Sequence, residues 1–174
     1  MKILKDIYYS EEKIAEKSLD VYLPDGECRA VFLYIHGGGI EAGSKGDQHR
    51  EGEYLAERGY AFVSINYRMY PNARFPEFIE DSAEAVAWAK KNMLSLCGCD
   101  KLYVGGSSAG GYISMMLCFD KHYLNAVRAV KFRHCRLLAR CGSADHPLQR
   151  PQIRRVRSAQ SHSRRARAAL FCRT

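Results

Sequence analysis

The chain has 174 residues, of which 47% are hydrophobic, and a formal net charge of +8. This length allows one domain with a sizeable core. No apolar run reaches the roughly 18 residues that a transmembrane helix needs, so a membrane-spanning class is not expected. Residues 1–6 lack the apolar core of a secretory signal, so a cytoplasmic location is expected.

The positive charge lies in the last part of the chain. Residues 1–125 contain 14 Lys and Arg against 18 Asp and Glu, a balance of −4. Residues 126–174 contain 13 basic residues against one acid, a balance of +12. We therefore predict two parts: residues 1–125 as part of a folded domain, and residues 126–174 as an Arg-rich tail. We expect the tail to be disordered or read from a shifted frame.

The first part of the chain predicts an α/β fold with a mostly parallel, doubly wound sheet. Two leading strands, at residues 2–10 and 17–23, have no helix between them and predict an antiparallel edge. From residue 30 onward strands and helices alternate, which indicates parallel strands with helices on both faces. These strands are predicted at residues 30–35, 60–67 and 101–105, and the helices at residues 46–58, 76–92 and from about residue 113.

Phe75, Ile79, Ala83 and Val86 recur at helical spacing around the second of these helices. They predict one buried stripe along it.

Small residues surround a serine pair after the strand at residues 101–105. The segment Gly106-Ser107-Ser108-Ala109-Gly110 matches G-x-S-x-G, the pattern of a nucleophile elbow at a sharp strand-to-helix turn. Only Ser108 has glycines two residues before and after it, so Ser108 is the predicted nucleophile. The pattern is short, and a plain turn before a helix would also satisfy it.

A second glycine cluster, His36-Gly37-Gly38-Gly39, follows the apolar strand at residues 30–35. Bare backbone amides in such a run can approach a developing oxyanion closely. A phosphate-binding loop is the alternative for a glycine run, but it needs Lys followed by Ser or Thr at the helix start, which neither glycine cluster has.

Together these two motifs, each on its expected element, resemble the α/β-hydrolase fold. The chain resembles the HGGG-bearing esterase/lipase group related to hormone-sensitive lipase over about residues 1–125. The segment with Tyr67-Arg68 and Pro71, and Asp81 in the helix after it, also resembles that group. We expect Asp81 to be a solvated helix residue, with a structural bond to the Tyr67-Arg68 loop as the lesser alternative.

The resemblance implies a serine carboxylic-ester hydrolase that acts on a small ester without a metal or organic cofactor. Ser108 would be the nucleophile, and the amides of Gly38, Gly39 and Ala109 would form the oxyanion hole. His36 would brace the glycine loop by hydrogen bonding.

The acid and base of the family's triad follow the nucleophile in the chain. Asp145, His146 and His162 are the weak candidates for these roles. We therefore expect a fold truncated after the elbow strand and its helix, and a weakly active or inactive chain. The strand at residues 101–105 would then be an unpaired edge, prone to oligomerisation or aggregation.

An alternative function rests on the tail, whose arginines favour nonspecific binding to nucleic acid or an anionic membrane. It has no specific nucleic-acid motif.

The chain has seven cysteines, and Cys97-Gly98-Cys99 has one residue between its thiols instead of the two of a zinc knuckle. Reduced, scattered thiols are expected.

Overall fold

The computed structural model describes residues 1–127 and 136–140. Its strands are β1 (Lys2–Tyr8), β2 (Ser18–Leu23), β3 (Val31–Ile35), β4 (Ala61–Ile65), β5 (Leu102–Ser107) and β6 (Arg136–Arg140). Its α-helices are α1 (His49–Ala56), α2 (Glu77–Cys97), α3 (Ala109–Phe119) and α4 (Lys121–Ala126). Short 3₁₀ turns at Ala15–Lys17 and Lys45–Gln48 precede β2 and α1.

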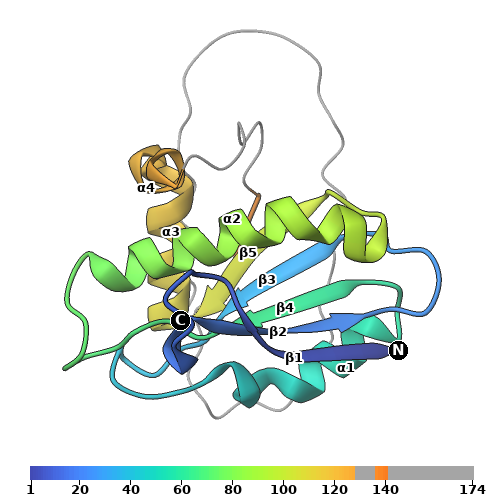
Figure 1. The fold of residues 1–174 in the computed structure, drawn as a ribbon, viewed down its shortest axis with the longest axis horizontal. Coiled ribbons are helices and arrows are strands. Elements are labelled where there is room, and N and C mark those ends of the chain that lie inside the picture. The colour runs from blue at the N-terminus through green and yellow to red at the C-terminus, as the bar shows by residue number, and fades with distance from the viewer. Residues whose placement is uncertain (128–135, 141–174) are drawn as a thin grey trace, which may run out of the picture. The chain divides into compact units, whose positions relative to one another are not determined.

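The described strands form one mixed sheet in the order β1-β2-β4-β3-β5-β6 (Figure 1). β1 pairs antiparallel with β2, and β2 pairs antiparallel with β4. β3 lies between β4 and β5 and pairs in parallel with both. The α/β class and the antiparallel edge predicted from the two leading strands are therefore confirmed.

The prediction that β5 would be an unpaired edge is wrong. β6 pairs in parallel with β5, in register from Tyr103 opposite Arg136 to Ser107 opposite Arg140. That prediction rested on the lack of complete strand–helix units after the elbow, and a single five-residue strand does not show that pattern. Such a strand needs only backbone hydrogen bonds, which satisfy N–H and C=O groups that β5 would otherwise expose.

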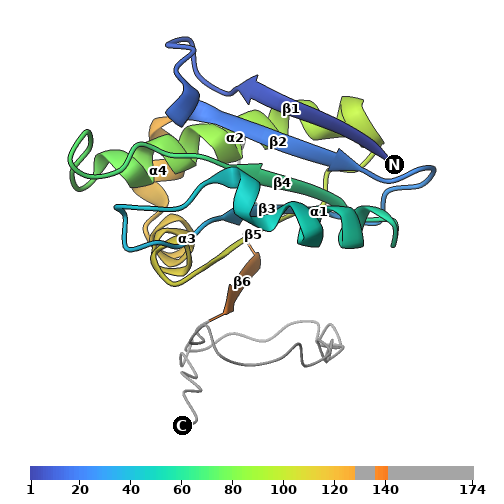
Figure 2. The ribbon, with the colours of Figure 1, turned by 90° about the horizontal axis from the view of Figure 1, so that it is seen from below.

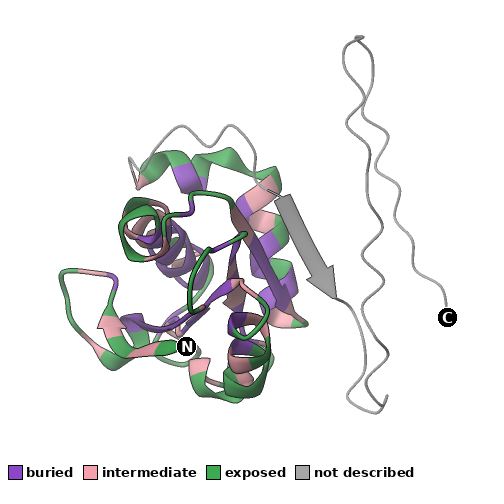
Figure 3. Cartoon of the chain, turned by 90° about the vertical axis from the view of Figure 1, so that its right-hand side faces the viewer, coloured by how far each residue is buried: buried purple, intermediate pink, exposed green. Residues whose placement is uncertain are grey.

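Helices cover both faces of the sheet, as predicted (Figure 2). α1 packs on one face, where Ala56 lies with Tyr22 and Phe62 in a small apolar cluster. α2 and α3 pack on the other face over the main core, to which β3 contributes Val31, Leu33 and Ile35. The intervening Phe32 and Tyr34 point to the α1 side, as strand alternation requires. Figure 3 shows these central strands as the buried part of the described chain.

Helix α2 is longer than predicted, and its buried stripe begins later. Ile79, Ala83 and Val86 are fully buried, as expected, but Phe75 is 61% exposed. Phe75 lies before the first helical residue, so helical spacing does not place it on the buried face. The helix continues to Cys97. Gly98, which adopts a left-handed conformation with φ of 70°, then ends it.

Among the residues that the structure describes, no helix is long and apolar enough to cross a membrane.

The two ends of the predicted stripe should respond differently to truncation. We expect Ile79→Ala to lower the free energy of unfolding by about 2–5 kcal/mol, because it removes a fully buried side chain. Phe75→Ala should cost at most about 1 kcal/mol, because its side chain is already largely in water. Urea unfolding followed by circular dichroism measures both. Equal losses in the two variants would contradict the observed start of the stripe.

Candidate active site

The predicted nucleophile lies at the junction between β5 and α3. Ser108 immediately precedes the first residue of α3, and its backbone has φ of 49° and ψ of −116°. Few non-glycine residues adopt such a conformation, and strain of this kind is typical of functional sites. Ser108 is exposed, whereas the preceding Ser107 is half-buried. The sharp turn therefore presents Ser108 to solvent at the carboxyl end of the strand.

The two glycines of the G-x-S-x-G pattern are required by the end of β3. A Cβ atom added to Gly106 would lie 2.4 Å from the backbone oxygen of Ile35. A Cβ on Gly110 would lie 2.0 Å from the same oxygen and 2.6 Å from the backbone oxygen of His36. Any larger residue would force β3 and the elbow apart. The glycine positions thus match the register that selects Ser108 as the elbow residue.

The glycine loop after β3 lies directly against the elbow. A Cβ atom on Gly37 would lie 2.9 Å from the backbone oxygen of Ser107 and 3.4 Å from Cβ of Ser108. Gly38 has φ of 108°, and its carbonyl accepts hydrogen bonds from the backbone N–H groups of Glu41 and Ala42. The structure therefore brings together two segments about 70 residues apart in the sequence, as the two motifs together predicted.

Backbone N–H groups without a partner occur in the glycine loop and at the start of α3. Gly38 and Gly39 are exposed, and within the described part of the chain no hydrogen bond is recorded for their N–H groups. Ala109 is the first residue of α3, so its N–H has no partner within the helix. The positive end of the helix dipole lies at the same place. Such an arrangement can stabilise a negatively charged oxygen.

His36 lies beneath the glycine loop. Its ring is buried and stacks on the ring of Tyr67, with the two ring centroids 4.4 Å apart. Nδ1 of His36 lies 2.7 Å from the backbone oxygen of Gly37. Because a carbonyl only accepts, Nδ1 carries the proton. Burial lowers the pKa of His36, although the bond to Gly37 acts in the opposite direction. His36 is therefore a neutral brace for the loop, as expected.

Tyr67 also stabilises this loop, through the backbone of His36. Its hydroxyl donates to the backbone oxygen of His36 at 3.0 Å, and burial raises the pKa of Tyr67 to about 12. The hydroxyl therefore keeps its proton and its hydrogen bond at neutral pH. The sequence showed Tyr67 only as part of a family resemblance. Its contact with His36 is visible only in the structure.

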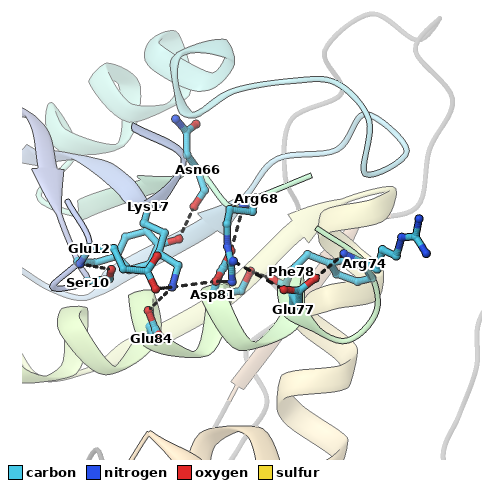
Figure 4. Close-up of polar contacts among 12 residues, drawn as sticks. Ser10, Glu12, Lys17, Asn66, Arg68, Arg74, Glu77, Phe78, Asp81 and Glu84 are labelled. Atoms are coloured by element: carbon cyan, nitrogen blue, oxygen red, sulfur yellow. Dashed lines mark hydrogen bonds and ion pairs between the residues drawn. The ribbon is translucent and has the colours of Figure 1, made fainter. Parts of the chain in front are cut away.

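Asp81 is not the solvated helix residue that was expected. It is 1% exposed and accepts three hydrogen bonds from Arg68, through the backbone N–H, Nε and Nη2, at 2.8–3.0 Å (Figure 4). The lesser alternative, a structural bond to the Tyr67-Arg68 loop, is therefore the correct one. Helical position alone did not reveal this, because the loop that buries Asp81 arrives from the end of β4.

A buried lysine completes this cluster. Nζ of Lys17 lies 3.2 Å from both Asp81 and Glu84 (Figure 4). Burial favours the neutral amine, but the Asp81 and Glu84 carboxylates more than offset this and raise the pKa of Lys17. Nothing in the sequence around Lys17 indicated this role.

The weak candidates for the acid and base, Asp145, His146 and His162, lie outside the described residues, as does most of the Arg-rich tail. Within residues 1–127 and 136–140, no hydrogen bond joins a histidine to Ser108. In the same residues, no group of three or more His, Cys, Asp or Glu side chains is arranged to bind a metal ion.

Neutralising Asp81 should destabilise the fold strongly. Asp81→Asn leaves the charges of Lys17 and Arg68 with no carboxylate at the centre of the cluster, and we expect a loss of about 3–5 kcal/mol in the free energy of unfolding. Glu84→Gln is the matched control, since the Glu84 side chain is 35% exposed, and should cost about 1 kcal/mol or less. Urea titrations compare the two, and similar losses would argue against a central role for Asp81.

Burial of neutral His36 should make stability depend on pH. The unfolded chain takes up a proton at His36 near its ordinary pKa of 6.5, whereas the folded chain does so only at lower pH. The free energy of unfolding should therefore fall as pH decreases below 6.5. His36→Gln should remove this part of the slope, while His122→Gln, at an exposed site, should retain it. Urea titrations between neutral and mildly acidic pH measure the slopes, and an unchanged slope in His36→Gln would refute the prediction.

Comparison with known proteins agrees with this geometry. The BD-FAE family model matches residues 19–134. A probable isoprenylcysteine alpha-carbonyl methylesterase, ICMEL1 of Oryza sativa subsp. japonica, is 29% identical over 116 residues, covering 65% of this chain and 27% of the relative. A probable carboxylic ester hydrolase, LipM of Mycobacterium tuberculosis, is 31% identical over 168 residues, covering 87% of this chain and 39% of the relative.

Solved structures give the same fold. Esterase B of Lactobacillus rhamnosis superimposes with a TM-score of 0.67 at 18% identity, covering 80% of this chain and 47% of that one. A bifunctional GH43-CE protein of Bacteroides eggerthii has a TM-score of 0.57 at 30% identity, covering 64% of this chain and 16% of that one. The chain thus spans less than half the length of each of these relatives. It belongs to the BD-FAE family, among the α/β-hydrolases of the HGGG-bearing esterase/lipase group.

Proposed function

We propose that the chain carries the nucleophile and oxyanion hole of a serine carboxylic-ester hydrolase, with Ser108 as the nucleophile. The observation that supports this most is the strained, exposed Ser108 between the glycine loop after β3 and the first turn of α3. Membership of the family supports a hydrolase of the esterase/lipase type.

In the proposed reaction, Oγ of Ser108 attacks the carbonyl carbon of an ester and passes its proton to a general base. The carbonyl oxygen becomes an oxyanion, which accepts hydrogen bonds from the N–H groups of Gly38, Gly39 and Ala109. Collapse of this intermediate breaks the bond to the alcohol, which leaves with a proton. Water then attacks the acyl-enzyme and releases the carboxylic acid.

The general base is not supplied by the residues that the structure describes. Nδ1 of His36 bonds to Gly37; its Nε2 is buried without a hydrogen-bond partner, and no hydrogen bond joins His36 to the exposed Ser108. In a triad, loss of the base reduces turnover by about 10⁶, leaving the contribution of the oxyanion hole. We therefore propose that this chain by itself is weakly active or inactive as an esterase.

The proposed substrate class is a small carboxylic ester. Two relatives bear the names of a methylesterase and a carboxylic ester hydrolase, and one solved structure is described as a carbohydrate esterase from gut microbiota. All of these reactions transfer an acyl group from an ester oxygen, which the same nucleophile and oxyanion hole can serve.

An organophosphorus probe tests the nucleophile directly. The full chain is incubated with a fluorophosphonate at pH 9, where hydroxide partly replaces the missing base, and the modified residue is identified by mass spectrometry. We expect one phosphonyl adduct, at Ser108, formed as fluoride leaves, because the phosphonyl oxygen of the probe carries partial negative charge and can occupy the proposed oxyanion hole. Before the probe is added, the chain should hydrolyse p-nitrophenyl acetate far more slowly than an ordinary esterase.

Ser107→Ala is the matched control for Ser108→Ala. The control should label at the wild-type rate, because Ser107 is half-buried, and Ser108→Ala should not label. Heat-denatured chain should not label either. Labelling that persists in Ser108→Ala, or that is equally fast in the denatured chain, would contradict the proposal.

A further inference from the structure

Three of the chain's cysteines come together at the end of the sheet opposite Ser108. Cys28 lies three residues before Val31, and Cys99 lies three residues before Leu102. Val31 and Leu102 are partners in the parallel pairing of β3 with β5, and the N–H of Val31 donates to the backbone oxygen of Lys101 at 2.9 Å. Cys28 and Cys99 therefore occupy equivalent positions at the amino ends of two adjacent strands.

The third thiol joins them from helix α2. Cys97 is the last residue of α2, and left-handed Gly98 turns the chain back toward β5. Cys97 packs against the buried cluster that contains Cys28 and Cys99, and the Cys28 thiol is within hydrogen-bond reach of both other thiols. The loop before β3 and the end of α2, far apart in the sequence, are thus in thiol contact.

The three thiols differ in access to solvent. Cys28 and Cys99 are buried, while Cys97 is half-buried. Burial raises the pKa of both Cys28 and Cys99, so each is mostly a protonated thiol and reacts with an oxidant more slowly than a free thiol would. An oxidant from solvent would therefore meet Cys97 first, with Cys28 next to it.

We propose that this cluster is an oxidation site, at which a peroxide converts Cys97 and Cys28 to a disulfide. The Cys97 thiolate attacks the peroxide, the O–O bond breaks, and Cys97 becomes a sulfenic acid. The Cys28 sulfur then attacks the Cys97 sulfur, the S–S bond forms, and water leaves as the S–O bond breaks. The two thiols together lose two electrons, which reduce one hydrogen peroxide to two water molecules.

The disulfide would close a chain loop of about 70 residues between the start of β3 and the end of α2. A cross-link over such a loop restricts the unfolded chain and so stabilises the folded one. Because the cluster lies at the amino ends of β3 and β5, and Ser108 follows the carboxyl end of β5, the inference does not depend on the proposed esterase chemistry.

Peptide mapping of the oxidised full chain tests this inference. The reduced protein is treated with hydrogen peroxide, blocked with iodoacetamide, and digested with trypsin without reductant. Cys28 falls in the peptide of residues 18–29, and Cys97 and Cys99 fall together in the peptide of residues 92–101. We expect these two peptides to be linked, with fragmentation placing the bond between Cys28 and Cys97. The oxidised chain should also melt about 4–10 °C higher than the reduced one.

Variants separate this pair from the other thiols. Cys97→Ser should reduce the yield of the cross-link at least tenfold, whereas Cys99→Ser and Cys118→Ser should retain it. Cys28 linked to Cys135, Cys141 or Cys172, a bond between Cys97 and Cys99, or overoxidation of Cys97 without a cross-link would each overturn the proposal. The mapping of the wild-type chain decides the question even where a variant does not fold.

Discussion

The close contact between the end of β3 and the β5–α3 turn is the constraint on which the site depends. Gly106 and Gly110 leave no room for a side chain against the backbone oxygens of Ile35 and His36. This contact brings Gly37, in the glycine loop, against Ser107 and Ser108. The strained backbone of Ser108 is tolerated because the strand before it and the helix after it are both packed.

A second layer of polar contacts supports the loop from within the protein. Asp81 accepts a hydrogen bond from the backbone N–H of Arg68. The neighbouring Tyr67 donates one to the backbone oxygen of His36, and the His36 ring donates one to the backbone oxygen of Gly37. Each link joins a different element, from α2 through the loop after β4 to the end of β3. A buried carboxylate that is paired with two cations thus helps to position a glycine loop it does not touch. The cost of burying these charges is offset only because each has a partner.

Much of the fold could be predicted because local patterns report backbone periodicity. The alternating β2 and the apolar β3 and β4 were recognisable, and so were the two glycine motifs, one after β3 and one at the end of β5. β6 was missed because a five-residue strand is stabilised by its partner and not by its own pattern. The burial of Asp81 and of Lys17 was missed for a related reason, since the groups that surround them come from distant parts of the chain.

The sequence by itself determined the order of strands and helices from β1 to α3, the family resemblance and the identity of the candidate nucleophile. These follow from residue spacing and from backbone limits that glycine alone can meet. Only the tertiary structure decided that Ser108 lies against Gly37, that Asp81 is buried with its partners, and that Cys28 lies beside Cys97. Such contacts join segments tens of residues apart, and packing, which no local pattern encodes, brings them together.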